Sequence, residues 1–188
     1  MRFIDMTDEQ KASTIEVNRN IYTSDTSWYH EEYDEIKEEL EKMGFGSDVD
    51  LQFSGFCSQG DGASFTTKHI NIEKVLRHFK VWSQYRPIHR FIRDNEVSYE
   101  IYRRGNMYVH SNTMVISDGY SFDGELTPKQ NNAMDVLYDE VLSMARVQAD
   151  RIYRRLEELC NWYESDEFLA EYFEINEYEF CEHHFTLI

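Results

Sequence analysis

The chain has 188 residues, of which 41% are hydrophobic and 15% aromatic, and only two are prolines. This is enough apolar material to bury a core without disulfides or metal, so we expect a folded globular chain. The 36 acidic and 19 basic residues give a net charge of -17. A field of that sign repels phosphate backbones, which argues against direct binding of duplex nucleic acid.

The negative charge is concentrated near the two ends of the sequence. Residues 1–50 carry 14 acidic and 5 basic residues, and residues 151–188 carry 10 and 3. This distribution suits a partner with a basic surface, although acidic surfaces also serve solubility alone.

The cysteines and the hydropathy pattern indicate a cytoplasmic protein. Cys57, Cys160 and Cys181 are far apart and outside any CxxC spacing, which favours a reducing compartment over a disulfide framework. No apolar run approaches the roughly 18 residues that a membrane span needs, and the N-terminal segment has no apolar core of the kind that signal peptides carry. We therefore expect neither secretion nor membrane insertion.

Two helices are predicted in the N-terminal quarter. Thr7 followed by Gln10 forms a capping box that begins a short helix over residues 7–20. Over residues 25–43 the apolar positions alternate at spacings of four and three, and Gly44 can end the second helix. The other face of that helix is an acidic stripe that can contact a basic partner or simply be solvated. The predicted partner-binding residues on it are Glu31, Glu32, Glu35, Glu38 and Glu39.

The middle of the chain reads as strands and short helices. Residues 51–67 form two strand patterns on either side of a glycine-rich turn. Residues 72–93 suit one or two short helices that Pro87 separates. Residues 97–117 are rich in β-branched and aromatic side chains around Arg104-Gly105-Asn106, which indicates a hairpin in the same antiparallel sheet.

The C-terminal third is predicted to be mainly helical. Thr127, Pro128 and Gln130 combine an N-cap, a proline at the first helical position and a capping-box partner. Apolar positions keep helical spacing to Ser165, which gives a helix roughly 55 Å long. Ser165 can cap a further helix to residue 175, and residues 178–188 read as a final strand.

The glycine-rich turn is the strongest candidate for a ligand-binding site. Glycines let backbone N–H groups converge on an anion or a base, and polar side chains extend from the turn into both flanking strands. The alternative is a plain hairpin whose glycines supply positive φ, with Asp61 bonded to its own backbone. The predicted ligand-binding residues are Ser54, Ser58, Gln59, Gly60, Asp61, Gly62 and Ser64, together with His110.

His110 is predicted to lie on a strand, sharing one face with Asn112 while Ser111 and Thr113 share the other. We expect this strand and the glycine turn to meet in one sheet and form a single recognition surface. A His110–Asp61 pair could then act as a general base or bind a polar ligand, whereas a purely structural histidine is the alternative. Cys181 and His183 would share a face of the final strand, but no paired motif supports zinc there, so we predict no metal site and no cofactor.

Three segments together resemble a family of phage and prophage proteins. They are Phe53–Phe65 (FSGFCSQGDGASF), Arg104–Met114 (RGNMYVHSNTM) and Asn176–Phe180 (NEYEF). Members of the family are often labelled antitoxins of a toxin–antitoxin stability system. The resemblance implies a setting in the cytoplasm of a phage-infected host cell, and it implies no catalytic residue.

We therefore predict a single α+β domain over residues 1–188, with an antiparallel sheet of about four or five strands, N-terminal helices and a long C-terminal helix. The predicted function is an antitoxin-like or anti-defence binding protein that neutralises a host protein through an acidic surface. Two alternatives are a sequestering protein for a small nucleotide-like ligand and a hydrolase that uses Asp61 and His110.

Overall fold

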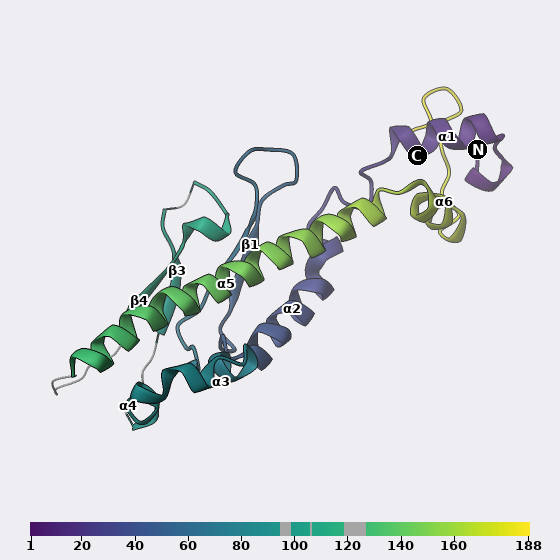
Figure 1. Cartoon of the computed structure of the whole chain (residues 1–188). Helices are drawn as coiled ribbons and strands as arrows, with labels where there is room; N and C mark the ends of the chain where they lie inside the picture. The colour runs from purple at the N-terminus through teal and green to yellow at the C-terminus, as the bar shows by residue number, and fades with distance from the viewer. Residues whose placement is uncertain (95–98, 106, 119–126) are drawn as a thin grey trace. The chain divides into compact units, whose positions relative to one another are not determined.

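The computed structural model describes residues 1–94, 99–105, 107–118 and 127–188. The chain mixes helices and strands and has a long C-terminal helix, as predicted (Figure 1). Contacts divide it into two compact units, of which unit 1 comprises residues 1–31 and 155–188 and unit 2 comprises residues 32–154. This division describes contacts and not independent folding, so the single domain stays a prediction.

The described residues of unit 2 form four strands in two antiparallel pairs. Leu51 lies opposite Phe65 in the first pair, and Ile101 lies opposite Ile116 in the second. Thr67 and Ile101 exchange two backbone hydrogen bonds of 2.9 Å, which place the second strand beside the third. The bounds are β1 Asp50–Phe53, β2 Ala63–Thr66, β3 Tyr99–Arg103 and β4 Met114–Asp118.

The prediction of one sheet with four or five strands was therefore wrong, because the described residues form two sheets of two strands. A single bridge joins β2 to β3 because the chain turns away directly after it. The Thr67 hydroxyl donates to the Phe45 carbonyl over 2.7 Å and contacts Asp48 Oδ1 over 2.7 Å, which fixes that turn.

The helices of unit 2 bury one face each against the strands and one another. In α2 (His30–Met43) the buried positions are Ile36 and Leu40. Gly44 ends this helix at φ +109°, and a Cβ there would lie 2.9 Å from the Val75 backbone nitrogen, so only glycine fits. The short helices that follow are α3 Ile72–His78, the 3-10 segment η3 Trp82–Ile88 and α4 His89–Asp94.

Pro87 does not separate two helices as predicted, since it lies inside η3. The break falls at Tyr85, whose φ of -97° and ψ of 21° are not helical. Pro87 is the next-to-last residue of this short 3-10 segment and follows the break at Tyr85, so its missing N–H costs few hydrogen bonds.

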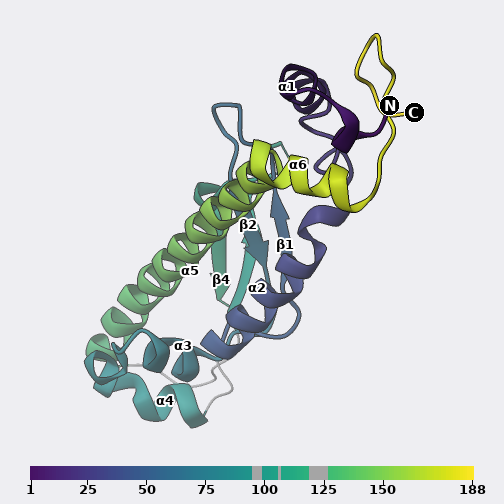
Figure 2. The ribbon, with the colours of Figure 1, turned by 90° about the vertical axis from the view of Figure 1, so that its right-hand side faces the viewer.

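The long helix α5 (Pro128–Tyr163) begins at the predicted capping box, in which Thr127 and Gln130 exchange three contacts of 2.8 to 3.3 Å. Within unit 2 it runs alongside the strands (Figure 2). Its buried face there comprises Met134, Leu137, Val141, Ala145, Gln148, Ala149 and Ile152. Within the described ranges no helix, α5 included, is long and apolar enough to cross a membrane.

Unit 1 is built from both ends of the chain around an aromatic core. The buried cluster comprises Phe3, Met6, Ile15, Leu169, Phe173 and Phe180. The predicted caps are confirmed, since Thr7 and Gln10 form the capping box of α1 and Ser165 caps α6. Its elements are η1 Phe3–Asp5, α1 Asp8–Val17, η2 Ser27–Tyr29 and α6 Asp166–Ile175.

The predicted final strand over residues 178–188 was wrong. The segment folds back on itself through a bridge between Phe180 and Leu187, and a second bridge joins Arg2 to Glu179. Phe185 has φ +54°, a left-handed conformation that interrupts an extended strand.

Candidate functional site

The glycine turn is held by hydrogen bonds within its own loop. The Ser54 N–H donates to the Gly62 carbonyl over 3.0 Å, and the Gly62 N–H donates back to Ser54 Oγ over 3.0 Å. Asp61 Oδ2 accepts from the backbone N–H groups of Cys57 at 2.9 Å and Ser58 at 2.6 Å. Ser54 and Asp61 thus stabilise the loop itself. This arrangement agrees with the alternative of a plain hairpin in which Asp61 is bonded to its own backbone.

The turn nevertheless packs against the His110 segment, although the two belong to separate sheets and not to the one sheet that was expected. A Cβ added to Gly62 would lie 2.9 Å from His110 Cδ2 and 3.0 Å from the Val109 carbonyl oxygen. A Cβ on Gly60 would lie 3.2 Å from Tyr108 Cδ1. Two glycines therefore let the β1–β2 loop touch the segment that precedes β4, and Figure 1 shows both loops beyond the same end of the strands.

His110 does not lie on a strand, contrary to the prediction. It caps the 3-10 turn η4 (Ser111–Thr113), in which His110 Nδ1 accepts the Asn112 N–H over 3.0 Å. In the neutral imidazole the proton is therefore on Nε2. The Ser111 hydroxyl lies 3.4 Å from Nδ1 and its residue is only 3% exposed, so it packs as a structural group.

The connection between β3 and β4 is also longer than the predicted three-residue loop, since β3 ends at Arg103 and β4 begins at Met114. The Arg104 N–H still donates to the Thr113 carbonyl over 2.7 Å. Asn106 of the predicted loop and Val97 of the predicted strand lie outside the described residues.

The other predicted ligand-binding residues divide into exposed and buried. Ser58 and Gln59 are exposed at the tip of the loop, whereas Ser64 on β2 is 1% exposed and faces the core. Sequence reasoning missed Tyr108, which is 55% exposed beside Gly60. It also missed Tyr153, whose hydroxyl donates to the Gly55 carbonyl over 3.2 Å.

The acidic stripe on α2 lies on the solvent side of that helix. Its predicted residues Glu31, Glu35, Glu38 and Glu39 are exposed, and Glu32 is half-buried. Lys42 forms an exposed ion pair of 3.2 Å with Glu38. Because Ile36 and Leu40 hold the opposite face in the core, the helix face that bears these carboxylates is turned to solvent.

Unit 2 also has a cluster of exposed basic residues in one segment, although the net charge of the chain is strongly negative. Over residues 68–93 there is one acidic residue, Glu73, and seven basic residues that are all exposed: Lys68, Lys74, Arg77, Lys80, Arg86, Arg90 and Arg93. Glu73 accepts from Arg93 at 2.9 Å and from Arg77 at 2.8 Å, and these bonds lower its pKa to about 2. The two guanidinium groups also lie 5.3 and 5.6 Å from the Trp82 ring.

Across the described ranges no group of three or more histidine, cysteine, aspartate or glutamate side chains could hold a metal ion. Cys181 and His183 do not share a strand face, because that strand does not form. Hydrogen bonds from the backbone N–H groups of His183 and then His184 lower the pKa of the Cys181 thiol.

Comparison with known proteins identifies the family. Residues 28–166 match the model described as Domain of unknown function (DUF8835). The chain belongs to this family. No curated protein and no solved structure matches it.

The DUF8835 match contains the whole of unit 2 and leaves most of unit 1 outside. Residues 1–27 and 167–188, which include α1 and nearly all of α6, are not matched. Unit 1 nevertheless has 16 acidic and 4 basic residues, a net charge of -12 out of -17 for the chain. The unmatched residues carry 11 acidic and 3 basic residues, a net charge of -8, so the negative charge is divided almost equally between the matched and the unmatched parts of the chain.

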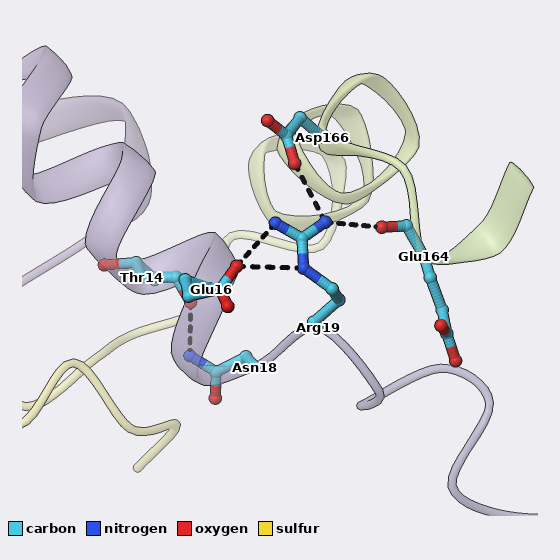
Figure 3. A network of polar contacts seen from close by, with 6 residues as sticks. All are labelled: Thr14, Glu16, Asn18, Arg19, Glu164 and Asp166. Carbon is cyan, nitrogen blue, oxygen red and sulfur yellow. Dashed lines mark hydrogen bonds and ion pairs between the residues drawn. The ribbon is translucent and has the colours of Figure 1, made fainter. Parts of the chain in front are cut away.

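Three basic residues of unit 1, Arg2, Lys11 and Arg19, are paired with carboxylates. Arg2 binds Asp5 at 3.0 Å and Lys11 binds Glu174 at 3.3 Å. Arg19 binds Glu16 at 2.7 Å and Asp166 at 2.9 Å, and it donates to the Glu164 carbonyl over 2.8 Å (Figure 3). The Arg19 contacts join the end of α1 to the start of α6, and the Lys11–Glu174 pair joins α1 to the end of α6.

Proposed function

We propose that this protein is a non-enzymatic binding protein that neutralises a basic host protein, as an antitoxin-like or anti-defence factor encoded by a phage. The observation that carries the proposal is the row of exposed carboxylates on α2, held in place by a buried opposite face. A fixed array of like charges steers and orients a partner of opposite charge. The resemblance to phage and prophage proteins supplies the setting in a host cytoplasm.

The hydrolase alternative has less support. It needs Asp61 and His110 to act on a substrate, whereas both accept hydrogen bonds from neighbouring backbone N–H groups. Asp61 and His110 thus already have structural roles in their own loops.

The test uses a charge-reversal variant of α2, Glu35→Lys/Glu38→Lys/Glu39→Lys, and a control with the same change of charge on α5, Asp135→Lys/Asp139→Lys/Asp150→Lys. All six positions are exposed. A partner is captured from host lysate with the wild-type protein, identified and purified, and its affinity is measured by calorimetry from low to high salt. We expect the affinity to fall with salt and the α2 variant to lose more than the control. An affinity that is flat with salt, or equal losses in the two variants, contradicts the proposal.

A second candidate function is sequestration of a small nucleotide-like ligand, which the contact between Gly62 and the His110 segment favours. The exposed Ser58 and Gln59 would then bind the base or the phosphate. The cluster of basic residues offers another position, a hollow of about 460 Å³ lined in part by Arg86 and Lys129. A thermal-shift screen with nucleotides tests this function, since a ligand that binds only the native state raises Tm. Loss of the shift in Gln59→Ala places the ligand at the turn, loss in Arg86→Ala places it in the basic hollow, and no shift with any nucleotide rejects the candidate.

A further inference from the structure

Unit 1 has an open hollow of about 360 Å³ between the end of α5 and the helix α6. Its apolar lining is unusually exposed for large side chains, since Trp162 is 46% exposed and Ile175 is 70% exposed. Contiguous exposed apolar side chains of this size are typical of interaction sites, and tryptophan is among the residues enriched in binding hot spots. The lining residues are Trp162, Phe168, Glu171, Tyr172, Ile175 and Asn176.

The aromatic part of the hollow is held in place from behind. Phe168 and Tyr172 stack with centroids 5.7 Å apart at 12°, and the Tyr22 ring packs edge-on against both at 5.0 and 5.1 Å. The Tyr172 and Tyr178 hydroxyls are 3.0 Å apart. Because these rings already have fixed neighbours, a ligand would lose little free energy in ordering them.

The surroundings of the hollow are strongly negative. Glu171 is part of the lining and has no hydrogen bond or ion pair to any described residue. Glu167 lies one turn before it on α6 and is also exposed. Arg2, Lys11 and Arg19 of unit 1 are paired with carboxylates other than Glu167 and Glu171, so these three cations do not neutralise the hollow.

We propose that this hollow is the docking site for an amphipathic helix of a partner protein, with apolar residues on one face and lysine or arginine beside them. The proposal rests on the proposed function and names the chemistry of the partner segment. An apolar face read at helical spacing fits an aromatic-lined groove, and flanking cations meet the unpaired carboxylates. A second copy of the chain fits poorly, because each unit 1 has a net charge of -12 and two of them repel each other.

The probe is a synthetic helical peptide of about 18 residues, long enough to form a helix on binding, with leucines on one face and lysines elsewhere. Two control peptides accompany it. One has the same composition in a shuffled order without an apolar face, and the other has glutamate in place of lysine. Binding to the full-length protein is measured by fluorescence anisotropy of a dye on the peptide, at several salt concentrations.

We expect the amphipathic basic peptide to bind most tightly and the acidic peptide not to bind. Trp162→Ala and Ile175→Ser should each raise Kd at least about tenfold, equivalent to about 1.4 kcal/mol. The matched control is Val17→Ser, because Val17 is a 52% exposed apolar residue of unit 1 outside the hollow. Glu171→Lys should raise Kd and flatten its salt dependence more than Glu182→Lys, which changes an exposed carboxylate elsewhere in unit 1.

Three results would overturn the docking site. Equal affinity for the shuffled peptide would mean that charge alone binds, and equal effects of Ile175→Ser and Val17→Ser would place binding elsewhere. Sedimentation showing a dimer that Ile175→Ser dissociates would make the occupant a second copy. Each of these leaves the α2 charge-reversal experiment intact, so failure of the docking site and failure of the proposed function are distinguishable.

Discussion

The contact between the glycine turn and the His110 segment can be tested with one methyl group. Gly62→Ala adds a Cβ whose three nearest atoms are His110 Cδ2 at 2.9 Å, His110 Cα at 3.0 Å and the Val109 carbonyl oxygen at 3.0 Å. Two of these atoms belong to backbone, which cannot rotate away as a side chain does. Such overpacking typically costs about 1 to 3 kcal/mol.

Gly55→Ala in the same loop is the matched control. A Cβ there has only Asp61 Oδ2 nearby, at 3.8 Å, which is ordinary van der Waals contact. Neither glycine has a positive φ, so alanine can adopt the native backbone conformation at both positions. Both substitutions reduce the conformational entropy of the unfolded chain equally, which stabilises each variant by about 0.4 to 1 kcal/mol. Gly62→Ala should therefore be less stable than Gly55→Ala by at least about 1 kcal/mol in urea denaturation followed by circular dichroism. Equal stability of the two variants would refute the packing of the turn on the His110 segment.

Three further predictions concern local stability and pH. Thr127→Ala removes the hydroxyl that accepts the Gln130 N–H at the start of α5 and should cost about 1 kcal/mol in urea denaturation, whereas the exposed Asn132→Ala should cost less. The pKa of Glu73 is lowered from 4.5 to about 2, so its ion pairs stabilise the fold above pH 4.5, and this contribution is lost as pH falls toward 2. The Tm difference between wild type and Glu73→Gln should therefore shrink over that range, and a constant difference would contradict the assignment. Arg19→Lys removes the guanidinium that binds Glu16, Asp166 and the Glu164 carbonyl together. Hydrogen exchange should therefore show a loss of amide protection in α1 and α6. The control Lys42→Arg, which changes an exposed ion pair, should cause a smaller loss there.

Local signals in the sequence were sufficient to predict most helix ends. Thr7, Thr127 and Ser165 each accept a backbone N–H three residues later, and Gly44 adopts the left-handed conformation that ends α2. These features depend on residues within one turn of each other. They can therefore be read without knowledge of the tertiary fold.

The segment before β4 shows why such reading fails elsewhere. Val109, Thr113 and Val115 are β-branched and suggest a continuous strand. The His110 ring instead accepts the Asn112 N–H, and the Thr113 hydroxyl donates to the His110 carbonyl over 2.6 Å. Short polar side chains and histidine can thus form hydrogen bonds with the backbone that compete with the hydrogen bonds between strands. The sequence alone does not show which of the two sets of hydrogen bonds forms.

The candidate sites differ in how far the sequence could locate them. The turn could be found because glycine spacing and a nearby carboxylate are local. Its meeting with His110 was expected within one sheet, whereas the structure brings the two together from separate sheets. The hollow in unit 1 could not be found, because it depends on the angle between α5 and α6 across Ser165 and on the Tyr22 ring behind them. In the sequence its lining looks like an ordinary amphipathic helix pair.

The segregation of charge has a consequence for the kind of partner. A chain selected only for solubility needs its acidic residues dispersed, whereas here unit 1 has a net charge of -12 and residues 68–93 have seven exposed cations with one acid. Unit 2 has exposed carboxylates on α2 and exposed cations on α3, η3 and α4. A partner that is uniformly basic would be attracted by the first group and repelled by the second. Specific binding is therefore best satisfied by a protein with localised basic patches, and a featureless polycation such as polylysine should compete with it only weakly.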